Sequence, residues 1–143
     1  MLTIKSDKTT RTVIKKLKKG KTYYVRIRAY KTNGAKTTYG GYVAISGTTR
    51  ITNVAKFNAT ALSQTAVKLS WSRNTIASGY VIEQYKGGKW TQINVIRDKN
   101  VTTTVVGSLA KGTTYSFRMK SFKTVDGSNK FSEYISAKVT TAK

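Results

Sequence analysis

The sequence contains no cysteine, histidine or proline, and only five of its 143 residues are acidic. Without thiol and imidazole side chains, the chain cannot build a cysteine- or histidine-based nucleophile pair, a zinc site with the usual nitrogen and sulfur ligands, or a disulfide framework. These absences exclude most of the familiar enzyme classes. We therefore expect a protein that is not an enzyme and that carries no cofactor.

Long apolar runs are also missing. The first residues, MLTIKSDKTT, include no apolar stretch of signal-peptide length, and no run approaches the roughly 20 apolar residues that a membrane helix needs. We expect neither an export signal nor a membrane span within this chain. The lack of cysteine does not decide the compartment, because it suits both a cytosolic protein and a surface protein that folds without disulfides.

Positive charge is abundant. The chain has 27 Lys and Arg residues against 5 Asp and Glu, which gives a formal net charge of +22. Residues 1–50 hold 13 basic residues and 1 acidic residue, and residues 51–143 hold 14 and 4, so the charge is not confined to a tail. Such an excess predicts anionic surroundings or partners and says little about the fold.

The acidic residues are scattered singly through this basic background. Catalysis by a carboxylate pair needs two acids within about 10 Å, and a metal site with oxygen ligands needs several acids in one loop. Neither grouping is present, so we expect solvated surface charges and no metal site. The five residues are Asp7, Glu83, Asp98, Asp126 and Glu133.

Apolar and polar residues alternate with period two in many stretches, for example in residues 22–28, 67–71 and 115–120. This alternation predicts half-buried β-strands, and no long window shows the spacing of an amphipathic helix. Turn-forming pairs lie between the strand-like runs and predict antiparallel hairpins. These pairs are Asn33-Gly34, Gly87-Gly88 and Asp126-Gly127.

The chain contains an internal repeat. A shift of 92 residues aligns residues 10–49 with residues 102–141 without a gap, and roughly 14 of the 40 positions are identical. Residues 51–101 have no earlier counterpart. We therefore predict a complete unit over 51–143, preceded in 1–50 by the C-terminal half, the last strands, of a second unit.

Seven short strands are predicted in the complete unit, near residues 53–59, 65–72, 79–86, 89–96, 102–107, 113–124 and 131–140. Strands of this length and spacing predict an antiparallel two-sheet sandwich, so the fold class is all-β. The side chains expected to face inward are Val67, Leu69, Trp71, Tyr80, Ile82, Ile93, Leu109, Tyr115, Phe117 and Met119.

Three motifs resemble the fibronectin type III family, which has an immunoglobulin-like sandwich: Leu69-Ser70-Trp71, the run 79–82, and the run from Leu109 to Tyr115. The sequence is particularly similar to the Lys- and Tyr-rich versions in Gram-positive bacterial surface and secreted proteins. The resemblance implies that Trp71 fills the core, with Tyr80 and Leu109 also in the structural core. It also implies a tyrosine corner at Tyr115, and a second at Tyr23 after a buried Leu17.

The sequence departs from the family in two ways. The prolines usual near the first strand are absent, so we expect a link at 48–52 without the stiffness that proline gives. A half sandwich in 1–50 would also expose an apolar face and open strand edges. Two explanations stay open: a truncated unit, or a split unit that exchanges strands with another chain.

The Gly87-Gly88 turn predicts the strand register of its hairpin: Tyr85 opposite Trp90, Lys86 opposite Lys89, and Ile82 opposite Ile93. Tyr85 and Trp90 then lie together on the outside of the sheet. Such a pair can stack against sugar rings, with the two lysines attracting acidic glycans or a peptide. The alternative is ordinary cross-strand or inter-unit packing.

The densest basic stretch comprises Lys15, Lys16, Lys18, Lys19 and Lys21. It is either a patch for polyanions or a solvated loop anchored by Leu17. Specific nucleic-acid recognition is not expected, because stacking aromatics are not interleaved with the basic residues here.

Two functions follow from the residues and the resemblance. The first is a non-catalytic spacer or adhesion module of a larger extracellular or cell-surface bacterial protein, attracted to anionic cell-wall polymer or polysaccharide. Its partners would be neighbouring domains, such a polymer, or another protein. The second is a carbohydrate-binding module that uses Tyr85 and Trp90.

Overall fold

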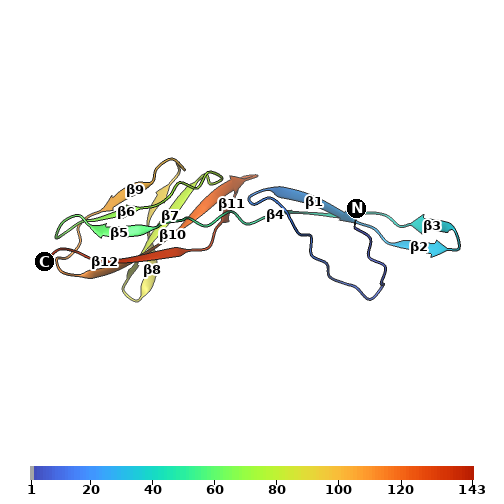
Figure 1. Ribbon diagram of the computed structural model, residues 1–143, viewed down its shortest axis with the longest axis horizontal. Helices are drawn as coiled ribbons and strands as arrows, with labels where there is room; N and C mark the ends of the chain where they lie inside the picture. The colour runs from blue at the N-terminus through green and yellow to red at the C-terminus, as the bar shows by residue number, and fades with distance from the viewer. Residues whose placement is uncertain (1) are drawn as a thin grey trace.

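The computed structural model describes residues 2–143, and it confirms the all-β prediction. Figure 1 shows an elongated molecule in which two units follow one another: the N-terminal unit (2–50) and the C-terminal unit (51–143). The strands are β1 (Thr22–Ile27), β2 (Tyr30–Asn33), β3 (Lys36–Tyr39), β4 (Val43–Thr48), β5 (Asn58–Ala61), β6 (Val67–Ser70), β7 (Gly79–Lys86), β8 (Lys89–Ile96), β9 (Thr103–Val106), β10 (Thr114–Val125), β11 (Ser128–Phe131) and β12 (Ile135–Thr140).

The C-terminal unit is a sandwich of two antiparallel sheets. One sheet has the order β5-β6-β9, and the other has the order β11-β10-β7-β8, with β12 also paired to β10. Inward-facing side chains of the two sheets, together with side chains from the chain next to the strands, form one core. This core comprises Val54, Phe57, Val67, Leu69, Trp71, Tyr80, Ile82, Leu109, Phe117 and Met119.

The N-terminal unit repeats part of this architecture. Strand β1 pairs with β4, and β2 pairs with β3, all antiparallel. The register Thr22↔Thr48 recurs as Thr114↔Thr140 between β10 and β12, and Tyr30↔Tyr39 recurs as Phe122↔Phe131 between β10 and β11. All these pairs differ by the 92 residues of the sequence repeat, so the repeated sequences form the same strand pairs.

Both units contain a tyrosine corner. The backbone N–H of Ala110 donates to the Tyr115 hydroxyl at 2.8 Å, and the N–H of Lys18 donates to the Tyr23 hydroxyl at 2.8 Å. A threonine closes each corner, because Thr141 Oγ1 donates to the Ala110 carbonyl and Thr49 Oγ1 to the Lys18 carbonyl, both at 2.7 Å. These local contacts do not require the opposite sheet.

Two strand predictions change. The predicted strand 53–59 is wrong, because the chain pairs only from Asn58. Val54 and Phe57 are both buried, and their spacing of three does not fit a pleated strand with one buried face. The predicted strand 131–140 is shorter, because residues 132–134 are not in a strand and β12 begins at Ile135. Strand β11, which ends at Phe131, was not predicted. The strands 79–86 and 89–96 are confirmed as β7 and β8.

Two predicted core residues lie at the surface. A bulge at Ile82/Glu83 pairs Ile82 with Asn94, so Ile93 is the extra residue of β8 and is exposed. Leu17 is exposed as well. Its equivalent, Leu109, is buried against the opposite sheet of the C-terminal unit, and the described N-terminal residues supply no such sheet.

The link between the units is held at several points despite the absence of proline. Ile51 is buried, and its side chain packs next to Gly20, whose N–H donates to the Arg50 carbonyl at 3.2 Å. Lys123 Nζ donates to the Gly20 carbonyl at 3.1 Å. The expectation that the link lacks the stiffness of proline stays a prediction, and these contacts connect the two units beside it.

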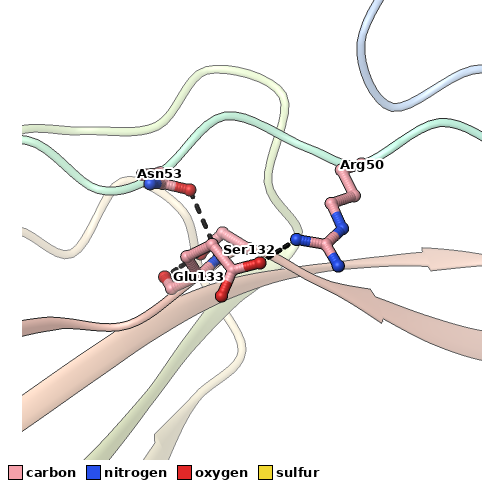
Figure 2. A network of polar contacts seen from close by, with 4 residues as sticks. All are labelled: Arg50, Asn53, Ser132 and Glu133. Atoms are coloured by element: carbon pink, nitrogen blue, oxygen red, sulfur yellow. Dashed lines mark hydrogen bonds and ion pairs between the residues drawn. The ribbon is translucent and has the colours of Figure 1, made fainter.

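Figure 2 shows the polar side of this junction. The Arg50 guanidinium forms an ion pair with the Glu133 carboxylate, and the backbone N–H of Glu133 donates to Asn53 Oδ1 at 3.2 Å. Ser132 Oγ donates to the Glu133 carbonyl at 2.9 Å. Residues from the link and from the β11–β12 connection therefore meet directly.

Candidate functional site

The β7–β8 hairpin presents the predicted aromatic pair. Gly87 and Gly88 both have positive φ, as a two-residue type I′ turn requires. The strand register pairs Tyr85 with Trp90 and Lys86 with Lys89. The ring centroids of Tyr85 and Trp90 are 5.3 Å apart, with 62° between the ring planes. The rings meet edge to face, so they do not form one flat surface.

Arg118 of β10 lies beside this pair on the same outer face of the sheet. Its guanidinium carbon is 4.5 Å from the centroid of the Trp90 ring and 3.9 Å from that of Tyr134. At this distance a guanidinium is attracted to the face of an aromatic ring. Arg118 therefore covers part of the surface of Trp90 that a sugar ring would use.

Arg118 also holds the carboxylate of Glu83. Its Nε donates to Glu83 Oε2 at 2.6 Å, and the Tyr134 hydroxyl donates to Glu83 Oε1 at 2.5 Å. Burial raises the pKa of Glu83, but the hydrogen bonds from Tyr134 and Arg118 and the charges of Arg118 and Lys120 outweigh it, so this pKa lies below its ordinary value. Glu83 is thus part of an ion pair and is not the solvated charge that we expected.

The same face of the N-terminal unit carries an equivalent set of residues. Arg26 lies 4.2 Å from the Tyr42 ring centroid, and Arg28 lies 3.7 Å from that of Tyr39 and 4.7 Å from that of Tyr42. We call Arg26, Arg28, Tyr39 and Tyr42 the arginine–tyrosine cluster. Within residues 2–143, no acidic side chain forms an ion pair with either arginine.

The basic stretch lies in irregular chain just before β1. Lys15, Lys16, Lys18, Lys19 and Lys21 are all exposed, while the intervening Gly20 is buried at the junction. The structure brings this stretch to the junction, and Tyr85 and Trp90 lie on the hairpin of the other unit (Figure 1). The two predicted contact regions therefore do not form one site.

A conventional small-molecule site is not found among the described residues. Two open hollows among these residues have volumes of about 170 and 210 Å³, less than ligand pockets usually provide. No group of three or more His, Cys, Asp or Glu side chains within residues 2–143 could hold a metal ion. No helix in this part of the chain is long and apolar enough to cross a membrane.

Sequence reasoning missed the ion pair and the arginine–tyrosine cluster. Both depend on which strands are neighbours, since Glu83 faces Arg118 only because β7 pairs with β10. One signal was available in the repeat. Arg26 and Tyr42 stand 92 residues before Arg118 and Tyr134, so the alignment predicts equivalent positions for the two pairs.

Comparisons with known proteins identify the fold. No protein-family model and no curated protein sequence matches the chain. The crystal structure of FN3tt is 18% identical with a TM-score of 0.53, over 63% of this chain and 92% of that one. The fn3 domain of human collagen alpha-1(XX) chain is 15% identical with a TM-score of 0.55, over 67% and 90%.

A longer structure, the FN1–FN3 domains of chicken CNTN1, matches with 17% identity and a TM-score of 0.52. This match covers 89% of the present chain and 43% of that chain. Identities this low establish the fold alone. The chain is similar to fibronectin type III domains in structure.

Proposed function

We propose that the chain is a non-catalytic spacer and adhesion module of a larger bacterial surface or secreted protein. Its basic surface would hold it near anionic cell wall or glycan through attraction of low specificity. The observation that carries the proposal is the distribution of charge. Both units are strongly basic, and the five lysines of the stretch before β1 are exposed.

The spacer role is supported by the junction. Buried Ile51, buried Gly20 and the Lys123 hydrogen bond connect the two units without a disulfide. A link held in this way keeps neighbouring units at a fixed distance better than a flexible linker does. The missing ligand pocket among the described residues fits a contact surface better than a site for a small molecule.

The test is retention on an immobilised anionic polysaccharide at increasing salt. One variant changes Lys15, Lys16, Lys18, Lys19 and Lys21 to Gln. A matched control changes five exposed lysines of the C-terminal unit, Lys68, Lys86, Lys89, Lys111 and Lys138, to Gln. Attraction of low specificity predicts that both variants elute equally early and that salt abolishes binding of all forms. Selective loss in the first variant would contradict the proposal and indicate a local site.

The alternative is a carbohydrate-binding module that uses Tyr85 and Trp90, with Lys86 and Lys89. Tyr85 is exposed beside Trp90, which is the observation that favours it. The tilted rings and the position of Arg118 favour the first proposal instead. On a glycan array, the alternative requires selective binding that persists in salt and disappears in Trp90→Ala.

A further inference from the structure

Within residues 2–143, nothing covers one strand edge and one apolar face of the N-terminal unit. Strand β10 of the C-terminal unit pairs with β12 on one edge and with β7 on the other. Its equivalent, β1, pairs only with β4 within residues 2–143. The free edge of β1 is therefore the edge that β7 occupies in the C-terminal unit.

The repeat shows which chemistry fits this edge. In the C-terminal unit, β7 places Ile82 opposite Met119 and Glu83 opposite Arg118. Ile82 points into the core, and Glu83 takes its hydrogen bonds from Arg118 and Tyr134 on the outer face. One strand thus supplies an apolar side chain to one face and a carboxylate to the other.

The N-terminal unit presents the same two surfaces without their partners. Ile27 and Val25 occupy the positions of Met119 and Phe117, and both are exposed. Arg26 and Tyr42 occupy the positions of Arg118 and Tyr134. Since Arg26 lies 4.2 Å from the Tyr42 ring, the two donors that would hold a carboxylate are already close together.

We propose that the free edge of β1 binds a β-strand of another polypeptide with the pattern of β7, and that a glutamate of this strand occupies the Arg26–Tyr42 part of the arginine–tyrosine cluster. The strand adds antiparallel to β1, as in strand augmentation of an exposed sheet edge. The apolar residue immediately before the glutamate lies beside Ile27 on the inner face, as Ile82 lies beside Met119. Main-chain hydrogen bonds supply affinity, and the glutamate fixes the register.

A second copy of this chain fits the edge less well. Residues 1–50 hold 13 basic residues and 1 acidic residue, so two N-terminal units repel each other. The only acidic residue of that unit, Asp7, is not in a strand. Charge complementarity therefore favours a strand that carries a carboxylate over the edge of an identical unit.

The experiment adds an end-capped peptide with the sequence of residues 77–85, ASGYVIEQY, to the whole chain. Calorimetry measures affinity, and NMR follows the β1 amides and the Arg26 Nε–H resonance. Two control peptides carry Glu83→Gln, or have Ile82 and Glu83 interchanged. The interchanged peptide keeps composition and charge but moves the carboxylate to the apolar face.

The native peptide is expected to bind roughly tenfold more tightly than either control, with shifts confined to β1, Arg26 and Tyr42. When the chain carries Arg26→Gln, the native and Glu83→Gln peptides should bind with equal affinity. Lys31→Gln on β2 removes the same charge, and the difference in affinity between the two peptides should remain. The peptide comparison needs no altered chain, so it stays decisive if a variant unfolds the N-terminal unit.

Several results would overturn the proposal. They are equal affinity for the three peptides, no binding, shifts in the C-terminal unit alone, or dimerisation of the chain that protects β1 before any peptide is added. The last result would make a second copy the occupant. None of them bears on retention by anionic polysaccharide, so this inference and the proposed function can fail separately.

Discussion

The two units have the same strand register and the same tyrosine corner, yet they differ in burial. Phe117 and Met119 expose none of their surface, whereas Val25 and Ile27 at the equivalent positions expose 38% and 62%. The difference arises because β5, β6 and β9 cover only the C-terminal unit. Strand pairing and corner therefore follow from the repeated sequence, while a core needs the opposite sheet as well.

The outer faces show a parallel difference in charge. Arg118 is paired with Glu83, whereas Arg26 lies against Tyr42 without an acidic partner among the described residues. The carboxylate comes from β7, a strand that the N-terminal unit does not contain. The missing equivalent of β7 accounts for the unpaired guanidinium, and the missing opposite sheet accounts for the uncovered apolar face.

The largest expected effect tests the difference in burial. Phe117→Ala should lower the free energy of unfolding by about 4 kcal/mol, because it leaves a cavity in a closed core. Val25→Ala at the equivalent position should cost less than about 1 kcal/mol, since Val25 is already partly in water. Denaturation followed by the fluorescence of Trp71 and Trp90, both in the C-terminal unit, measures the first change. The effect of Val25→Ala is followed by NMR of the N-terminal unit. If both variants lose a similar amount of stability, the apolar face of the N-terminal unit is covered in solution.

An intermediate effect tests the difference in charge. Glu83→Gln should destabilise the C-terminal unit by about 2 kcal/mol at pH 7, because it weakens hydrogen bonds to a charged partner. The pKa of Glu83 is lower in the folded chain than its ordinary value of 4.5, so the carboxylate stabilises the fold above pH 4.5. This contribution is lost as the pH falls through the folded pKa.

Denaturant titrations of the parent and Glu83→Gln chains from pH 7 to pH 2 measure this dependence. Their difference in stability should be largest at neutral pH and should shrink below pH 4.5. Arg26→Gln is the matched control in the N-terminal unit, and it should leave the fluorescence transition unchanged. A difference that persists undiminished at pH 2 would rule out ionisation of Glu83 as its cause.

The sequence predicts those parts of the fold that depend on neighbours along the chain. The predicted strands 79–86 and 89–96 match β7 and β8, and the Gly87-Gly88 turn predicts the Tyr85–Trp90 pair. Prediction from the sequence fails where a contact joins residues that are far apart along the chain. The bulge that exposes Ile93 and the pairing of Glu83 with Arg118 both depend on how strands associate, and the period of one strand carries no information about its neighbours.

The candidate surfaces divide in the same way. The exposed lysines before β1 could be read from composition, because a run of charged residues rarely lies in a core. The contacts at the junction could not be predicted from the sequence, because they join Ile51 to Gly20 and bring Lys123 from a distant strand. Absence of proline indicated only that the backbone itself is not stiff.

The smallest expected effect concerns this junction. The Arg50 and Glu133 side chains are 78% and 61% exposed, so Arg50→Ala should change stability by less than about 0.5 kcal/mol. Residual dipolar couplings should also show the two units in an unchanged relative orientation, because Ile51 and the Lys123 hydrogen bond remain. Ile51→Ala is the contrasting variant, and it should loosen that orientation. If Arg50→Ala alone lets the units reorient, the ion pair fixes their relative orientation and the buried contacts do not. The orientation of the two units would then depend on an electrostatic interaction that salt can screen.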